Sequence, residues 1–165
     1  MPQLDFFDTK YKREDDRIDA GFGICDNGTI AYTQVNSPHE WIAVVNNSKK
    51  KKVLFTPVDH NIIAKRGDGS EISQCDGMLT DNEGDILIFV ELKTGRRSWI
   101  TEAVEQLKST ISLFNKNHDC KLFKDRRAYA VNSRCPHFPS SHKEIMQQFR
   151  SQSKFRLLIQ RNIDL

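Results

Sequence analysis

The sequence predicts an α/β fold in which helices flank a mixed central β-sheet. Residues 71–80 and 85–93 have strand character and flank the turn sequence Asp81-Asn82-Glu83-Gly84, so we expect a β-hairpin. From Ser98 to about Asn117 the apolar residues recur every three or four positions, which is typical of an amphipathic helix. Residues 127–131 then fit a buried strand parallel to the hairpin's second strand, because a long helix separates the two.

Strands are also expected before this hairpin. Residues 29–35 are rich in β-branched side chains and favour a short strand, whereas the glycine-rich residues 21–23 indicate a turn or loop. The apolar runs 41–46 and 52–58 are separated by polar residues and by the lysine run 49–52. This order predicts a second hairpin with a basic tip.

The ends of the chain carry weaker patterns. Residues 1–20 are densely charged and offer few aromatic side chains for burial, so we expect a flexible or helical arm. Residues 142–149 fit a short helix, and residues 155–160 fit a final strand. A length of 165 residues suits a single domain, 1–165, with a core of ordinary size.

The composition is typical of a globular cytoplasmic protein. Apolar residues make up 38% of the chain and charged residues 28%, and no run approaches the roughly 20 apolar residues that cross a bilayer. The first residues are acidic where a signal peptide would be basic. The net charge of +3 permits a polyanionic partner without requiring one. The cysteines lack paired spacing, so we expect free thiols in a reducing compartment: Cys25, Cys75, Cys120 and Cys135.

The predicted hairpin of residues 71–93 places polar side chains together on one face. With a four-residue turn at 81–84, Asp76 lies opposite Phe89 and diagonal to Glu91. Because side chains alternate along a strand, Glu91 and Lys93 then project from the same face as Asp76. The alternate positions form an apolar face for the core: Ile86, Ile88, Val90 and Leu92.

Two neighbouring carboxylates at the end of an apolar strand require a compensating cation. Mg²⁺ (or Mn²⁺) binds carboxylate oxygens and keeps several water molecules, so Asp76, Glu91 and the backbone carbonyl of Leu92 are the predicted metal ligands. The ammonium group of Lys93 would orient the attacking water and balance the charge that develops on a phosphate. The hairpin therefore predicts metal-dependent hydrolysis of phosphodiesters.

The sequence Gln-Cys-Asp-Gly-Met-Leu around Asp76 and the triplet Glu91-Leu92-Lys93, 15 positions apart (91 − 76), carry a family resemblance. With the hairpin turn between them and the helix and returning strand that follow, they resemble the PD-(D/E)xK nuclease superfamily over about residues 71–131. The resemblance implies a restriction-endonuclease-like core and a nuclease that acts on nucleic acid, with DNA as the first candidate substrate. Cys75 stands where the family name has proline, and Glu40 is a weak counterpart of the acid that the family's opening helix carries.

The exonuclease branch of this superfamily carries a glutamine on the helix after the motif. Gln106 occupies a similar place and is carried over as a catalytic residue, whereas Thr110 stands where a tyrosine often follows. Small members of the superfamily often pair two sites across a symmetric interface, so the resemblance allows a homodimer. A subunit of a larger defence or repair complex is the other assembly that we consider, in particular for a catalytically inactive module.

Three alternatives remain open from the residues alone. Glu91 and Lys93 could form a structural ion-pair set at a strand edge, without chemistry. The chain could also be a catalytically inactive nuclease-fold module that binds nucleic acid or a protein partner. A zinc site is a further hypothesis, although the spacing of its four candidate ligands does not match common zinc knuckles: His118, Cys120, Cys135 and His137.

Basic side chains supply candidate phosphate contacts. Arg96 and Arg97 follow Lys93 in the loop that leads to the helix N-terminus, where a phosphate is favoured. Lys50 and Lys51 belong to the lysine run and could contact phosphates in a salt-dependent way. The alternative for these two lysines is a solvated hairpin tip.

Overall fold

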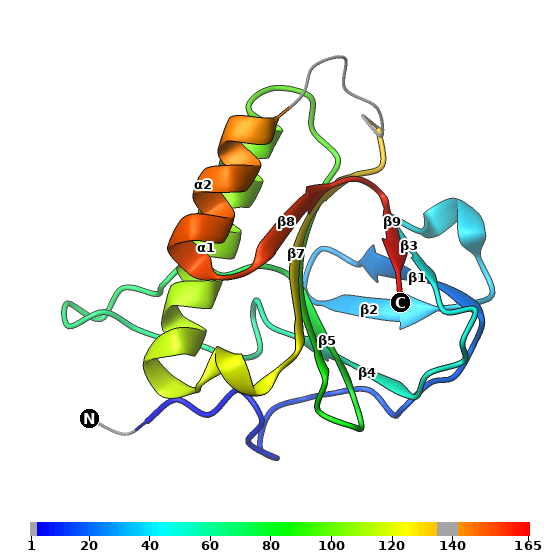
Figure 1. Ribbon diagram of the computed structural model, residues 1–165, viewed down its shortest axis with the longest axis horizontal. Coiled ribbons are helices and arrows are strands. Elements are labelled where there is room, and N and C mark those ends of the chain that lie inside the picture. Colours follow the sequence, from blue (N-terminus) through cyan, green and yellow to red (C-terminus); the bar gives the residue numbers. More distant parts are fainter. Residues whose placement is uncertain (1–2, 135–141) are drawn as a thin grey trace.

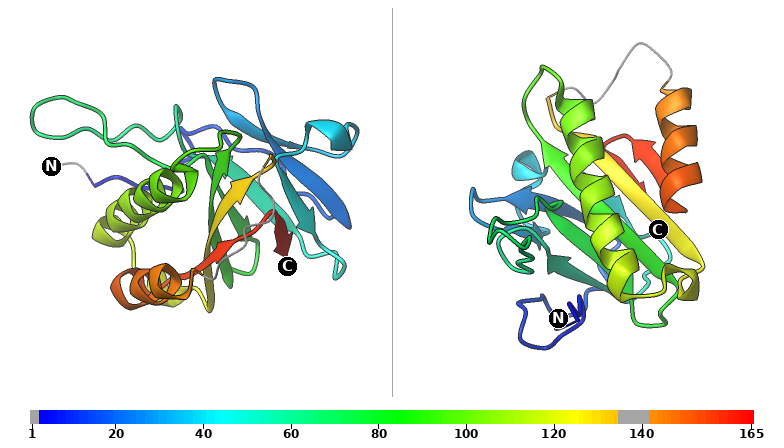
Figure 2. Two further views of the ribbon diagram at one scale, coloured as in Figure 1. Left: turned by 90° about the horizontal axis from the view of Figure 1, so that it is seen from above. Right: turned by 90° about the vertical axis from the view of Figure 1, so that its left-hand side faces the viewer.

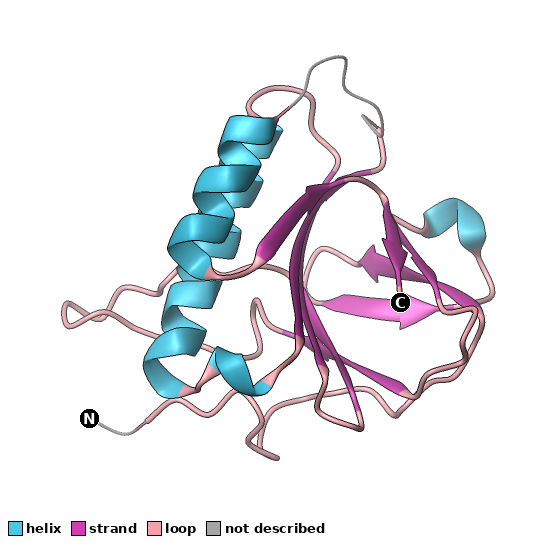
Figure 3. Ribbon diagram, viewed as in Figure 1, coloured by secondary structure: helices cyan, strands magenta, loops and turns pink. Residues whose placement is uncertain are grey.

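A computed structural model describes residues 3–134 and 142–165, in which two β-sheets and two α-helices form three layers (Figures 1 and 3). The larger sheet has the strand order β4-β5-β6-β7-β8, and the smaller sheet has the order β2-β1-β3-β9. The strands of the larger sheet are β4 (Val53–Pro57), β5 (Gly77–Asp81), β6 (Ile86–Lys93), β7 (Asp125–Asn132) and β8 (Arg156–Ile159). The strands of the smaller sheet are β1 (Gly21–Asp26), β2 (Ala31–Gln34), β3 (Ala43–Asn46) and β9 (Asn162–Asp164).

Both α-helices, α1 (Trp99–Asn117) and α2 (Lys143–Ser153), cover one face of the larger sheet, and the smaller sheet covers the other face (Figure 2). A 3-10 turn, η1 (Pro38–Glu40), precedes β3, and another, η2 (Cys120–Leu122), follows α1. The mixed sheet of the α/β prediction is confirmed, because β4, β5 and β6 are antiparallel while β6, β7 and β8 are parallel. The expected flanking by helices holds for one face only.

Strand β6 is buried on both faces of the larger sheet. Leu87 and Phe89 pack into a core under the helices, whereas Ile88 and Val90 pack into a second core against the smaller sheet. Every residue from Ile86 to Leu92 is buried, as expected for a central strand of a sheet with both faces covered. The prediction of one apolar face was therefore incomplete, because the face that carries Glu91 is also buried along most of its length.

The hairpin of β5 and β6 has a longer loop than predicted. Thr80 pairs with Leu87 and Gly77 pairs with Val90, which shifts the predicted register by two residues. The reason is the side chain of Asp81, whose Oδ1 accepts hydrogen bonds from the N–H groups of Asp85 at 2.8 Å and Ile86 at 2.9 Å. A shift of two positions leaves every side chain on its predicted face.

The expected loop at residues 21–23 is the first half of strand β1. Glycine is required there by packing, because a Cβ at Gly23 would lie 1.9 Å from the ring of Trp41. The expected hairpin over residues 41–58 is also wrong: β3 belongs to the smaller sheet and β4 to the larger one. The lysine run therefore crosses between two sheets.

The N-terminal segment contains no helix between residues 3 and 20. Phe6 is 1% exposed and packs edge-on against Phe89 and Phe114. Burial of such a ring contributes about 1.5–3 kcal/mol, which fixes the segment against α1.

The expected helices and the final strand are confirmed as α1, α2 and β8. Within the described residues, neither α-helix is long and apolar enough to span a bilayer.

Candidate active site

Asp76 lies immediately before β5, on a segment that is fixed from two sides. The N–H of Val58, just after β4, donates to the carbonyl of Asp76 at 2.9 Å. On the other side, the N–H of Cys75 donates to Oγ1 of Thr110 on α1 at 2.7 Å. Gly77 allows this close packing, because a Cβ there would lie 2.3 Å from the ring of Phe55. The backbone around Asp76 is thus held before any ligand binds.

The carboxylate of Asp76 reaches across to strand β6. Its Oδ2 accepts a hydrogen bond from the N–H of Leu92 at 2.7 Å. The N–H and C=O of one strand residue point to the same side of the strand, so the carbonyl of Leu92 also faces the side on which Asp76 lies. Since Gly77 pairs with Val90, the next positions outward are Asp76 and Glu91, directly opposite each other rather than diagonal.

Glu91 is the most unusual titratable residue at this end of the hairpin. Its side chain is buried, and the residue is 2% exposed. Burial, followed by the hydrogen bond with Asp76 and the charge of Asp76, raises the pKa of Glu91 to about 11, while Lys93 acts in the opposite direction. Among the described residues, Oε2 of Glu91 has no hydrogen-bond partner. In the absence of a cation, the Asp76–Glu91 pair therefore holds a proton at neutral pH.

Lys93 places a cation beside this pair. Its Nζ lies 3.9 Å from Oε2 of Glu91, beyond hydrogen-bond distance, and 3.7 Å from Oε2 of Glu102 on α1. Because Glu102 is largely exposed, its contact with Lys93 is weak and readily exchanged for water. The ammonium group thus stands at the solvent side of the carboxyl pair.

Gln106 lies on α1 between two residues that contact the segments around the carboxyl pair. Glu102 contacts Lys93 and Thr110 contacts Cys75, and Gln106 lies four residues from each of them on the same helix face. Its Oε1 is buried and has no hydrogen-bond partner in the described part of the chain. The helix therefore places a second unpartnered oxygen over the segment between Lys93 and Cys75.

These donors suit a hard divalent cation. Two carboxyl groups and the carbonyl of Leu92 are the oxygen ligands that Mg²⁺ accepts, and a buried oxygen of Glu91 has no other partner. The bound cation would replace the proton held by the pair and would remove the cost of an unpaired buried oxygen. The donor set therefore fits a metal at Asp76 and Glu91.

No family model, curated protein or solved structure matches the chain. The function is therefore inferred from the side chains and their arrangement.

Asp59 is a third carboxylate at this end of the hairpin, and the sequence analysis missed it. It lies two residues after β4, and its N–H donates to the carbonyl of Cys75 at 3.1 Å. Burial raises the pKa of Asp59, and the negative charge of Asp76 raises it further, while His60 lowers it. Asp59 stands at the end of an apolar strand, as Glu91 does, so the same signal was present in the sequence. The expected hairpin over residues 41–58 obscured it.

The predicted phosphate contacts are distributed over two places. Arg96 and Arg97 are exposed in the loop between β6 and α1, next to Lys93. Lys50 and Lys51 lie after β3, and Lys51 borders a depression beside the first residues of β7, at the opposite end of the sheet. The two arginines therefore lie in the loop that directly follows the strand of Glu91 and Lys93, and the two lysines lie at the other end of the sheet.

The zinc hypothesis receives no support from its first pair of ligands. Nε2 of His118 accepts a hydrogen bond from the N–H of Phe6 at 3.1 Å, and its ring stacks on Phe114. Cys120 is buried. Cys135 and His137 lie outside the described residues.

A separate group of acids, Asp81, Glu83 and Asp85, lies at the turn of the hairpin, with carboxylate oxygens within 4.8 Å of one another. Asp81 closes the turn through its two backbone hydrogen bonds, and Asp85 pairs with Lys124 at 3.6 Å. Asp81 and Asp85 therefore have partners in the fold, and Glu83 is exposed.

Proposed function

We propose that the protein is a metal-dependent nuclease with a restriction-endonuclease-like core. It would hydrolyse phosphodiester bonds of nucleic acid, with DNA as the first candidate substrate. The observation that carries the proposal is that Asp76, just before β5, lies beside Glu91, near the end of β6, and that a buried oxygen of Glu91 has no hydrogen-bond partner among the described residues. Structural ion pairs rarely leave such an oxygen unsatisfied.

The order of the elements supports the same reading. Three antiparallel strands, β4, β5 and β6, precede the long helix α1, and β7 then returns parallel to β6. This is the order expected of the core that the PD-(D/E)xK resemblance implies. In this proposal the smaller sheet would be an addition to that core.

Mg²⁺ or Mn²⁺ held by Asp76, Glu91 and the carbonyl of Leu92 would polarise the phosphate and supply a nucleophilic water. Lys93, at the solvent side of the pair, would donate hydrogen bonds to that water or to a phosphate oxygen. Gln106 would accept a hydrogen bond from the water through its unpartnered Oε1. The exposed Arg96 and Arg97 would contact the flanking phosphates.

In the reaction, the water oxygen forms a bond to phosphorus as the bond to the leaving strand oxygen breaks. A proton leaves the water, and the leaving oxygen gains one. One product strand ends in a phosphate and the other in a hydroxyl group. Lys93 stabilises the charge that develops on the phosphate oxygens, which typically accounts for about a hundredfold or more in rate.

The test is cleavage of supercoiled plasmid, linear duplex, single-stranded DNA and structured RNA with Mg²⁺ or Mn²⁺. We expect cleavage of at least one of these substrates by the wild type and loss of about a hundredfold or more in Glu91→Gln and Lys93→Met. Glu83→Gln is the matched control for Glu91, because it removes an exposed acid from the same hairpin.

Equal activity in Glu91→Gln and the wild type would contradict the proposal and would reveal a contaminating nuclease. A protein that binds nucleic acid but cuts none of the four substrates would instead be the inactive nuclease-fold module. Folding of each variant is checked by its thermal unfolding transition, so that loss of structure is distinguished from loss of chemistry.

A further inference from the structure

A basic depression of about 500 Å³ lies at the opposite end of the larger sheet from Glu91. We propose that it binds the phosphate backbone of nucleic acid, as a contact separate from the hydrolysis site. The choice of nucleic acid as its ligand rests on the proposed function. We define this basic depression by six of its lining residues: Lys49, Lys51, Arg126, Arg150, Lys154 and Arg156.

The fold gathers this charge from distant parts of the sequence. The parallel strands β7 and β8 begin at the same edge of the sheet, where Arg127 pairs with Arg156. The last turn of α2 contributes Arg150, and the crossing between β3 and β4 contributes Lys49 and Lys51. Figure 1 shows the end of α2, the start of β8 and the lower end of β7 close to one another. No single run in the sequence would have indicated this group.

The positive charge of the basic depression is largely uncompensated. Two acidic side chains line it against eight basic ones. Asp125 is bound by Arg127 through both oxygens at 2.9 and 3.0 Å, and Asp164 accepts from the neutral amide of Asn46 at 2.7 Å and keeps its charge. Within residues 3–134 and 142–165, no ion pair joins any of the six basic residues that define the depression to a carboxylate. Exposed like charges repel one another, so an anion that bridges them would be favourable.

The shape and chemistry favour an extended polyanion over a single nucleotide. The described residues that line the depression include no aromatic ring on which a base could stack. The side chains of Lys49, Arg150 and Arg156 are exposed and come from the segment between β3 and β4, from α2 and from β8. Cations spread in this way suit successive phosphates of one strand, which are recognised without regard to sequence.

The basic depression is distinct from the hydrolysis site. Arg126 precedes Ala130, the strand partner of Glu91, by four residues on β7, which corresponds to about 13 Å along the strand. Arg127, which also lines the depression, faces the smaller sheet, whereas Glu91 lies on the face covered by α1. Binding at the depression can therefore be measured without metal and without cleavage.

The experiment is fluorescence anisotropy with a labelled duplex of mixed sequence, in EDTA, over a range of salt concentrations. The double variants Lys49→Gln/Lys51→Gln and Arg150→Gln/Arg156→Gln should each bind about tenfold more weakly at fixed salt. The slope of log K against log salt should become shallower by about 1.8 for each pair, because each lost phosphate contact removes about 0.9.

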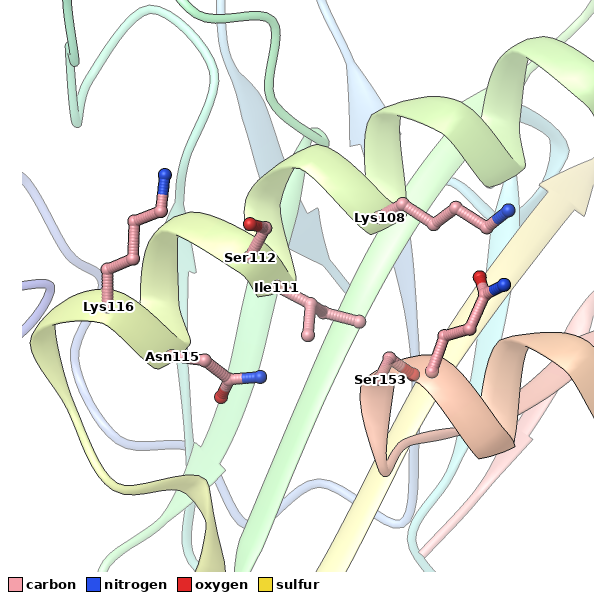
Figure 4. Close-up of a pocket in the computed structure, with 7 residues that line it drawn as sticks. Lys108, Ile111, Ser112, Asn115, Lys116 and Ser153 are labelled. Carbon is pink, nitrogen blue, oxygen red and sulfur yellow. The ribbon is translucent and has the colours of Figure 1, made fainter.

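The matched control is Lys108→Gln/Lys116→Gln, which removes the same charge from another part of the surface. These two lysines line a depression of about 410 Å³ between α1 and α2 (Figure 4). An equal loss of affinity in the control, or unchanged slopes in both test variants, would overturn the proposal. Competition by a nucleoside triphosphate as effective as that by the duplex, at equal phosphate concentration, would overturn it in favour of a small-ligand site.

Cleavage with Mg²⁺ is measured separately on the same wild-type protein. If no nucleic acid is cut but the test variants lose binding as expected, the proposed function fails and the basic depression stands. If cleavage occurs and binding is insensitive to both test variants, the proposed function stands and the depression fails.

Discussion

The two ends of the β5–β6 hairpin both carry carboxylates, but the fold treats them differently. At the turn, Asp81 accepts two backbone hydrogen bonds and Asp85 pairs with Lys124. At the other end, Glu91 is buried with an unpartnered oxygen beside Asp76. The number of acids is similar, so the difference lies in burial and in hydrogen bonding. Carboxylates whose oxygens are already satisfied stabilise a turn, whereas unsatisfied ones can hold a cation.

The largest expected contrast between the two ends is in catalysis. Asp76→Asn should lower kcat/KM for the best substrate by about a hundredfold or more, because a neutral amide cannot replace a metal-binding carboxylate. Asp85→Asn, the same exchange at the turn, should leave kcat/KM within about twofold. Steady-state cleavage assays of both variants measure this. Similar losses in the two variants would place the chemistry outside the Asp76–Glu91 pair.

The second contrast is in the pH dependence of stability. The pKa of Glu91 in the folded protein, about 11, is above its unfolded value, so the folded state holds a proton that the unfolded state has lost. The free energy of unfolding of the metal-free wild type should therefore fall as pH rises above about 4.5, by up to about 1.4 kcal/mol per unit.

Glu91→Gln lacks this proton and should become more stable than the metal-free wild type as the pH rises from about 6 to 9. Urea unfolding in EDTA at several pH values gives the comparison, with Glu83→Gln as the control that should follow the wild type. A constant difference between Glu91→Gln and the wild type across this range would show that Glu91 is ionised in the metal-free fold.

A smaller effect is expected on stability at the turn. Asp81→Ala removes the acceptor of two backbone N–H groups and should cost about 1–2 kcal/mol of unfolding free energy. Its kcat should stay close to that of the wild type, because the hairpin register is also fixed by β4 and β7. Urea unfolding and cleavage assays on one preparation test both statements. A large loss of kcat without loss of stability would give the turn a direct part in the reaction.

The smallest effect is expected at Asp59, which stands beside Asp76 but is partly exposed. Asp59→Asn should weaken the apparent affinity for Mg²⁺ by about tenfold and leave the cleavage rate at saturating metal nearly unchanged. Titration of activity with Mg²⁺ separates the two quantities. A loss of rate that excess metal does not restore would make Asp59 a direct ligand rather than a supporting residue.

The sequence was sufficient for the hairpin, helix and returning strand because their patterns are local. The spacing of Ile100, Leu107 and Phe114 and the turn at residues 81–84 each depend on neighbouring residues. The faces of Asp76 and Glu91 were also predicted, because a register shift of two positions preserves them. The exact register was not predicted, because it depends on the hydrogen bonds that the side chain of Asp81 accepts.

The parts that sequence reasoning missed depend on contacts between distant segments. From the sequence, Gly23 resembles a turn residue, and only the structure shows that the ring of Trp41 packs against it. The division of residues 41–58 between two sheets depends on β9, which pairs with β3 from the far end of the chain. Asp59 and the basic depression became recognisable only after that division was known.

The most direct test of the metal site is the binding of Mn²⁺, measured by electron paramagnetic resonance and by calorimetry in buffers of different ionisation enthalpy. The wild type should bind Mn²⁺ at Asp76 and Glu91 and release about one proton near neutral pH, because the cation displaces the proton held by Glu91. Asp76→Asn and Glu91→Gln should lose this binding, and Glu83→Gln should keep it. Binding that survives in both site variants, or that disappears in Glu83→Gln, would contradict a metal site at Asp76 and Glu91.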